Sequence, residues 1–210
     1  MAGGLKGYNG AVYIAAQTSL TLTNEACTDS GDDTTFYVTN AAKRYLDDTA
    51  AFTVEVDDGG GWDPAPSYTL QHAGGVIVFD SPLGAGDIVR ISGAYLPVAQ
   101  VARATEWSLD IEKSIEQDTE FGSSWESNVM LLGKASGSFK GNWQNGTWFT
   151  QLKSTTPRMV VVLYTDTTQN MRYEFMALLN KDSVAAAVAG LVEEEVAFQS
   201  VGQVHYRTFA

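Results

Sequence analysis

The residues best suited to metal binding or nucleophilic catalysis are few in this chain and far apart. The histidines are His72 and His205, and the single cysteine is Cys27. A zinc site needs several His or Cys ligands close together, and a thiol nucleophile needs a base that activates it. Neither arrangement is visible, and no other acid–base or nucleophile pattern emerges. The sequence therefore predicts a protein that is not an enzyme, with no catalytic residues, no metal site and no cofactor.

Two acidic segments, residues 29–33 and 57–63, suggest calcium loops by composition alone. Neither has the ligand spacing of a helix-loop-helix calcium site, and neither places a glutamate at the required position. Residues 59–61 are glycines, but no Lys-Ser or Lys-Thr follows them as in a phosphate-binding loop. We interpret both segments as turns.

The composition is that of a globular protein with a large excess of acids. Of the 210 residues, 44% are hydrophobic and 18% are charged, with 25 acidic residues against 13 basic ones. Binding to nucleic acid through phosphates needs clustered Lys and Arg, so a net charge of -12 argues against that class. Solubility is the ordinary explanation of such acidity. One cysteine allows no intrachain disulfide, which fits a reducing cytoplasm, and no apolar run is long enough to predict a membrane anchor.

The elements that position these side chains are mostly predicted strands. Alternating or β-branched runs indicate strands at residues 10–16, 35–39, 52–56, 67–72, 74–80, 87–97, 107–112, 133–143, 157–166 and 171–184, and one or two more at 190–209. Helices are predicted at residues 40–48, capped by Asn40, and from Asn145 for about two turns. Residues 117–132 show weak periodicity and are predicted to form a loop.

Two predicted strands carry unusual charge. From Trp107 onward, apolar and polar residues alternate, so Trp107, Leu109 and Ile111 should face inward and Ser108, Asp110 and Glu112 outward. Residues 193–195 are three glutamates in a row, which a strand would divide between its two faces. Such a strand lies at an edge, or has both faces against solvent or another subunit. The alternative is a loop before the last strand.

Four segments, in this order, carry a family resemblance: GYNGAVYI, VARATEWSLDI, TEFGSSW and SGSFKGNW. Their order resembles the major tail tube proteins of long-tailed, siphovirus-like bacteriophages. The resemblance covers about residues 7–17 and 98–210, and it implies a tail-tube core made of residues 1–17 and 98–210. Residues 18–97 intervene and are interpreted as an inserted or elaborating β region.

The resemblance implies a mainly β protein with a β-sandwich or half-barrel tail-tube fold and a flanking short helix. It implies a structural virion protein, made and assembled in the host cytoplasm, whose hexameric rings stack into the tail tube for genome delivery. The implied partners are other copies of the chain and other tail proteins, such as the tape measure and the tail terminator. Genomic DNA would pass through the tube without specific binding.

The resemblance also implies two groups of functional residues. A loop that reaches a neighbouring subunit would use aromatic side chains for buried area; its candidates are Thr119, Phe121, Gly122, Trp125 and Leu131. Carboxylates facing the tube lumen would repel DNA phosphates; some of these candidates should face it: Asp110, Glu112, Glu193, Glu194 and Glu195.

Other functions remain open at this point. A distal tail or tail-completion ring would form caps or single rings, and the tube of an injection device would bind a sheath. A soluble β-sandwich that binds glycans is the alternative from another class. It would stack sugars on Trp62, Trp125 or Trp148.

Overall fold

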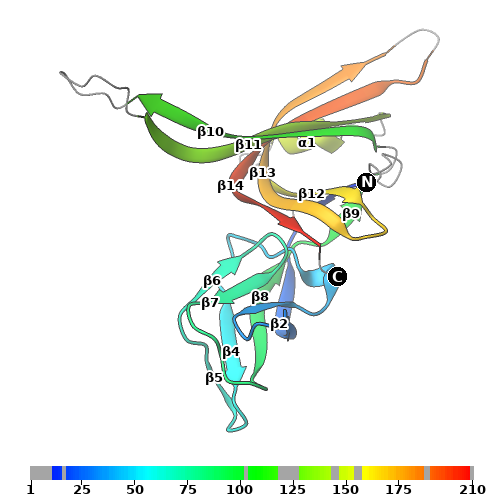
Figure 1. Cartoon of the computed structure of the whole chain (residues 1–210). Coiled ribbons are helices and arrows are strands. Elements are labelled where there is room, and N and C mark those ends of the chain that lie inside the picture. The colour runs from blue at the N-terminus through cyan, green and yellow to red at the C-terminus, as the bar shows by residue number, and fades with distance from the viewer. Residues whose placement is uncertain are drawn as a thin grey trace, which may run out of the picture. The chain divides into compact units, whose positions relative to one another are not determined.

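The computed structural model describes residues 11–15, 18–101, 104–117, 128–142, 147–153, 158–186 and 190–208. The chain is mainly β, with two antiparallel sheets, one of which is a half-barrel, and a short helix (Figure 1). The predicted fold class is therefore confirmed. No helix among these residues has the length and apolar character needed to cross a membrane.

The first sheet combines the start of the chain with its second half. Its strand order is β10-β11-β14-β13-β12-β1-β9. The bounds are β1 (Ala11–Ala15), β9 (Val98–Gln100), β10 (Ala104–Gln117), β11 (Asn128–Asn142), β12 (Arg158–Asp166), β13 (Met171–Ala185) and β14 (Glu193–Arg207). Strand β10 therefore lies at one edge of this sheet.

The second sheet is drawn from a continuous part of the chain. Its strand order is β5-β4-β8-β2-β3-β7-β6. The bounds are β2 (Leu20–Asp29), β3 (Thr35–Val38), β4 (Thr53–Asp57), β5 (Trp62–Pro64), β6 (Tyr68–Gln71), β7 (Val76–Phe79) and β8 (Ile88–Tyr95). The predicted division into a core and an inserted region of residues 18–97 stays a prediction.

By compactness the chain divides into two units. Unit 1 comprises Met1–Val101, Met159–Met176 and His205–Ala210, and unit 2 comprises Ala102–Arg158 and Ala177–Val204. Alternating side chains of the second sheet form one apolar core in unit 1. Its members are Leu22, Phe36, Val38, Leu46, Val54, Val56, Ile77, Phe79, Val89 and Ile91. Complete burial of such a side chain stabilises a fold by about 1.5–3 kcal/mol.

The predicted helix at residues 40–48 is much shorter in the structure. Only a single 3-10 turn, η2 (Ala41–Lys43), forms there, and the Asn40 side chain caps it by accepting from the Ala42 amide at 3.1 Å. The chain cannot continue as a helix because its next backbone groups bond elsewhere. The Leu46 amide donates to the His72 carbonyl, and the Tyr45 carbonyl accepts from the Leu96 amide. The second predicted helix is confirmed as α1 (Thr147–Leu152).

Further elements differ from the sequence prediction, among them the short strand β9, for which no strand was predicted. Strand β2 was not predicted, since its run LTLTNEACTD is largely polar. The short strand β5 begins at Trp62, inside the segment of residues 57–63 that was predicted as a turn. Strand β11 begins at Asn128, so residues 128–132 belong to a strand and not to the predicted loop.

Candidate functional site

Strands β10, β11 and β14 form one end of the first sheet, and its two faces differ in chemistry there. Trp107 opposes Phe139, and Phe139 opposes Val196 across the next pairing. Two positions further along, Leu109 opposes Gly137, which opposes Phe198. Because neighbouring residues point to opposite sides of a strand, these side chains share one face and the intervening residues share the other.

The apolar face is well packed around β11 and β14. Phe139 and Val196 are almost fully buried, and Trp148 of α1 meets the Phe139 ring edge-on at 5.2 Å between centroids. A β-carbon on Gly137 would lie 2.2 Å from the Ser108 carbonyl oxygen, so only glycine fits this close approach. Helix α1 thus anchors the apolar face of this sheet.

The apolar face becomes exposed toward the far end of β10. Trp107 and Leu109 are half-buried, whereas the Ile111 side chain is 57% exposed. Ile111 was predicted to face inward with the other two. It shares their face, but the prediction that it is buried is wrong, because packing on this face does not extend to its position. Ile111 is therefore an exposed apolar side chain on the edge strand β10.

The opposite side of these strands, which we call the polar face, carries five carboxylates and two lysines. Lys134 Nζ lies 3.0 Å from Glu112 Oε1, and Lys140 Nζ lies 3.6 Å from Glu106 Oε2. These four side chains are all about half exposed or more, so each pair contributes little to stability. The charged residues of the polar face are Glu106, Asp110, Glu112, Lys134, Lys140, Glu193 and Glu195.

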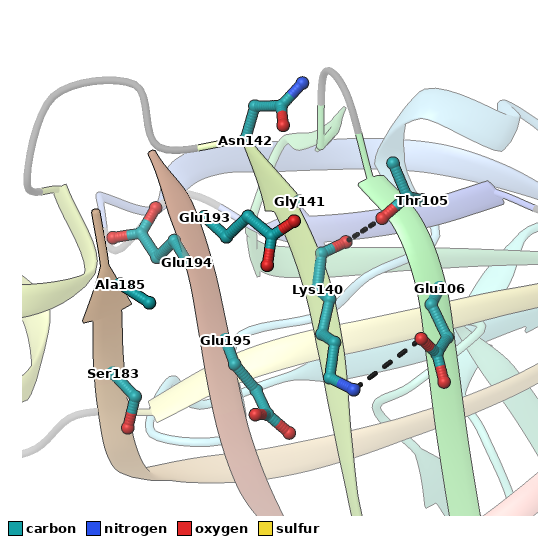
Figure 2. Close-up of a pocket in the computed structure, with 10 residues that line it drawn as sticks. All are labelled: Thr105, Glu106, Lys140, Gly141, Asn142, Ser183, Ala185, Glu193, Glu194 and Glu195. Carbon is teal, nitrogen blue, oxygen red and sulfur yellow. Dashed lines mark hydrogen bonds and ion pairs between the residues drawn. The ribbon is translucent and has the colours of Figure 1, made fainter. Parts of the chain in front are cut away.

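A groove of about 480 Å³ lies where four strands of unit 2 meet. Figure 2 shows Lys140 directed at Glu106, with Glu195 and Glu193 on the neighbouring strand. The groove is lined by Thr105, Glu106, Lys140, Gly141, Asn142, Ser183, Ala185, Glu193, Glu194 and Glu195. Its charged groups are therefore four glutamates and one lysine.

Residues 193–195 begin strand β14, so the loop alternative for this triplet is wrong. Glu193 and Glu195 lie on the polar face with Asp110 and Glu112. Glu194 points to the other face, is only 7% exposed and forms a hydrogen bond with Asp182 of β13. Burial, together with the neighbouring carboxyl, raises the pKa of Glu194, and burial raises that of Asp182. Four of the five acidic candidates thus share one surface, and whether that surface lines a lumen stays a prediction.

Most of the predicted inter-subunit loop lies outside the described residues. Thr119, Phe121, Gly122 and Trp125 lie outside them, and Leu131 lies within strand β11. Their role in assembly stays a prediction.

The three tryptophans of the glycan alternative have different surroundings. Trp62 is 36% exposed, and the Arg90 guanidinium lies 4.0 Å from its ring centroid. Trp148 packs on Phe139, and Trp125 lies outside the described residues. The described residues therefore offer no pair of exposed tryptophans for a sugar.

Cysteine and histidine are poorly placed for chemistry. Burial raises the pKa of the Cys27 thiol to about 12, which keeps it protonated and unreactive. Burial lowers the pKa of His72, whose ring packs on Phe52, and also that of His205. Across the described ranges, no group of three or more His, Cys, Asp or Glu side chains is arranged to hold a metal ion.

The chain turns within both acidic segments, at residues 30–34 and 58–61, although residues 62–63 of the second segment belong to strand β5. In the first, the Asp32 carboxylate accepts from the amides of Thr34 at 2.9 Å and Thr35 at 2.6 Å. These bonds lower the pKa of Asp32. In the second, Asp57 accepts from the amides of Gly59 and Gly61. The carboxylates close the turns and need no ion to do so.

A buried ionic cluster in unit 1 was not predicted. Glu174 of β13 is fully buried and accepts from Arg172 Nε, from Arg207 Nε at 2.8 Å and from the Tyr45 hydroxyl at 3.0 Å. Arg207 also donates to the Gln71 side chain and the Ala73 carbonyl. The signal in the sequence was the pair of charges inside the strongly apolar strand MRYEFMALL. The cluster ties β13 and β14 to the chain around β6.

Comparisons with known proteins found similarity only to solved structures. No family model matches the chain, and no curated protein matches it. One similar solved structure is the tail of an empty GTA particle computed with helical refinement in C6 symmetry. It has 14% identity and a TM-score of 0.42, and the match covers 53% of this chain and 87% of that one.

Another similar structure is the virion of a native gene transfer agent (GTA) particle. It has 13% identity and a TM-score of 0.41, and the match covers 52% of this chain and 88% of that one. At these identities and TM-scores, the two likenesses assign no function to the chain.

Proposed function

We propose that this chain is a structural virion protein whose hexameric rings stack into a phage tail tube, and that it has no catalytic role. The sequence motifs between Gly7 and Trp143 motivate the proposal. The observation that carries it is the polar face of β10, β11 and β14, where carboxylates outnumber lysines. In the proposed tube this face lines the lumen.

The charges of the polar face suit a wall past which DNA slides. Both lysines are in ion pairs with glutamates of β10, so neither ammonium is left to hold a phosphate. Asp110, Glu193 and Glu195 supply the remaining negative charge. A phosphate contact worth even about 1 kcal/mol, repeated in every ring, would slow DNA transit, and repulsion avoids it.

The other side of the same sheet suits contact between copies. Strand β10 is an edge strand of 14 residues, and such a long open edge is normally covered or blocked. Ile111 adds exposed apolar surface on that strand. A neighbouring subunit that covers both with a different patch of its own surface would bury area and close the edge, as the head-to-tail contacts of a ring require.

Electron microscopy of the concentrated protein, with light scattering of a dilute sample, tests assembly. Hollow tubes or stacked rings are expected. Single rings that never stack would point to a distal or tail-completion ring, and sheath binding would point to an injection device. A monomer at every concentration that is retained on a sugar column would contradict the proposal in favour of the glycan-binding alternative.

Matched variants separate assembly from folding. Ile111→Asp should abolish tubes while leaving the circular dichroism spectrum unchanged. Ile88→Asp is the control, because Ile88 is 53% exposed on β8 of unit 1 and is not part of the proposed contact. Trp125→Ala should also stop polymerisation. Tubes that form equally well from the Ile111 variant would remove β10 from the interface.

Charge reversal tests the lumen. Glu195→Lys should give tubes that retain double-stranded DNA at low salt and release it as salt is raised. The control is Asp58→Lys, since Asp58 is exposed in a turn of unit 1. Equal DNA retention by both variants would show that the polar face does not line the lumen.

A further inference from the structure

Asp182 of β13 and Glu194 of β14 form a carboxyl pair in unit 2 that the proposed assembly does not use. Their side chains hydrogen-bond to each other, and Glu194 is 7% exposed. Asp182 Oδ1 and Glu194 Oε1 are buried, and no N–H or other O–H group among the described residues donates to them. An ionised carboxylate only accepts hydrogen bonds, so two of them can bond to each other only if one carries a proton.

We propose that Asp182 and Glu194 together form a binding site for one proton, which makes the stability of unit 2 depend on pH. The bound proton supplies the donor that the hydrogen bond requires. It also removes one of two like charges from a buried position, where both could not remain ionised at low cost.

Among the described side chains of the strands around the pair, we find no cation that would replace the proton. Gly141 of β11 opposes Glu194 in register and contributes no side chain. Lys140 precedes it on the polar face and is paired with Glu106 of β10. On the pair's own strands, Lys181 is exposed and points away from Asp182, while Glu193 and Glu195 point away from Glu194.

A metal ion is a poorer occupant than a proton. Calcium takes six or more oxygen ligands, and the described residues hold no group of three or more acidic or His/Cys side chains that could bind an ion. Two carboxyl groups that share a hydrogen bond need a single proton and nothing more. The two groups then titrate as a pair, and not as independent acids.

The direction of the pH effect follows from the raised pKa values of both groups. At low pH the pair is protonated in the folded and the unfolded chain, so the folded state carries no cost from buried carboxylate charge. As pH rises past the ordinary carboxyl pKa, the unfolded chain releases its protons first. The free energy of unfolding therefore falls through this window until the folded pair has also ionised.

Unfolding followed by tryptophan fluorescence tests the proposal, because Trp107, Trp125, Trp143 and Trp148 lie in unit 2. The dilute protein is unfolded with urea between about pH 4 and pH 8. Glu194→Gln retains an amide donor in place of the protonated acid but cannot ionise. Its midpoint should exceed that of the unchanged protein at the alkaline end and match it at the acidic end. Asp182→Asn should behave in the same way.

Glu195→Gln is the matched control, since it removes a neighbouring carboxylate from the polar face. It should keep the pH dependence of the unchanged protein. If Glu194→Gln also keeps that dependence, or loses stability equally at every pH, the proposal is overturned.

A second measurement needs no variant. Carboxyl carbon NMR of the unchanged protein should show one proton of the Asp182–Glu194 pair retained to a pH above the ordinary carboxyl range. Two independent titrations at ordinary carboxyl pKa values would overturn the proposal. Neither result depends on ring or tube formation.

Discussion

Replacing Glu174 by glutamine should destabilise the protein more than any surface charge replacement. Glu174 is fully buried between two guanidinium groups, and Arg172 and Arg207 are themselves only 2% and 8% exposed. Glutamine has nearly the same size, so the packing is kept. What is lost is the negative charge, which leaves two buried arginines without their carboxylate.

The expected cost can be set by comparison with other buried pairs. Removing one partner of a buried ion pair typically costs about 3–5 kcal/mol, because the remaining charge is uncompensated. Domains are usually stable by about 5–15 kcal/mol, so this variant loses a large part of the total. With a urea dependence of about 1–3 kcal/mol per molar, the unfolding midpoint should fall by at least about 1 M.

Two further variants provide reference values for the loss in free energy of unfolding. Tyr45→Phe removes one neutral donor at 3.0 Å and should cost about 1 kcal/mol, since both arginine bonds remain. Glu112→Gln removes an exposed partner of Lys134 and should cost less than about 1 kcal/mol. All three are compared by urea unfolding monitored by circular dichroism.

The order of the three variants decides the interpretation. If Glu174→Gln lowers the free energy of unfolding no more than Tyr45→Phe does, the reasoning about the buried charge is refuted. Such a result would mean that the arginines find water or other acceptors, and that the cluster is not held by the carboxylate charge.

Three other predictions concern the packing and the turns. Gly137→Ala should destabilise unit 2 by about 1–3 kcal/mol, because the new methyl meets the Ser108 carbonyl; Gly133→Ala, with its nearest neighbour at 3.6 Å, should be tolerated, and equal urea midpoints would contradict the close approach. Asp32→Asn should remove a stabilising contribution that the unchanged protein has above the ordinary aspartate pKa and loses as pH falls through the lowered one, so the two proteins should converge in acid, as urea unfolding at several pH values would show. Cys27 should react slowly with iodoacetamide at neutral pH and rapidly in urea, since burial raises its pKa to about 12; fast alkylation of the folded protein would show that the thiol is accessible.

The sequence allowed the strands with clear alternation to be predicted well. Val54 and Val56 are buried as expected, and so are Ala135 and Phe139. These positions follow directly from the two-residue period. Strand β2 escaped prediction because its residues are mostly polar, and only pairing with β3 and β8 reveals it. Pairing partners distant in sequence leave no local periodic signal.

In the candidate site as well, local alternation could be predicted from the sequence and pairing between strands could not. Alternation correctly placed Asp110 and Glu112 on one side of their strand. It could not show that Glu195 lies on the same face, since that depends on the register between β11 and β14. The partner of Glu194 was equally hidden, because Asp182 lies on another strand and neither residue has a local signature.

The boundaries of the two units have a consequence for any attempt to express either one alone. Strand β13 contributes its first residues to unit 1 and the rest to unit 2, and β14 does the reverse. A fragment ending near residue 101 would contain the second sheet and Tyr45 but would lack Glu174 and Arg207. The tyrosine hydroxyl would then lose its acceptor, and Gln71 and the Ala73 carbonyl would lose their donor. Each unit combines stretches that are separated along the chain, so unit 1 cannot finish folding until its last stretch, which begins at His205, has been synthesised.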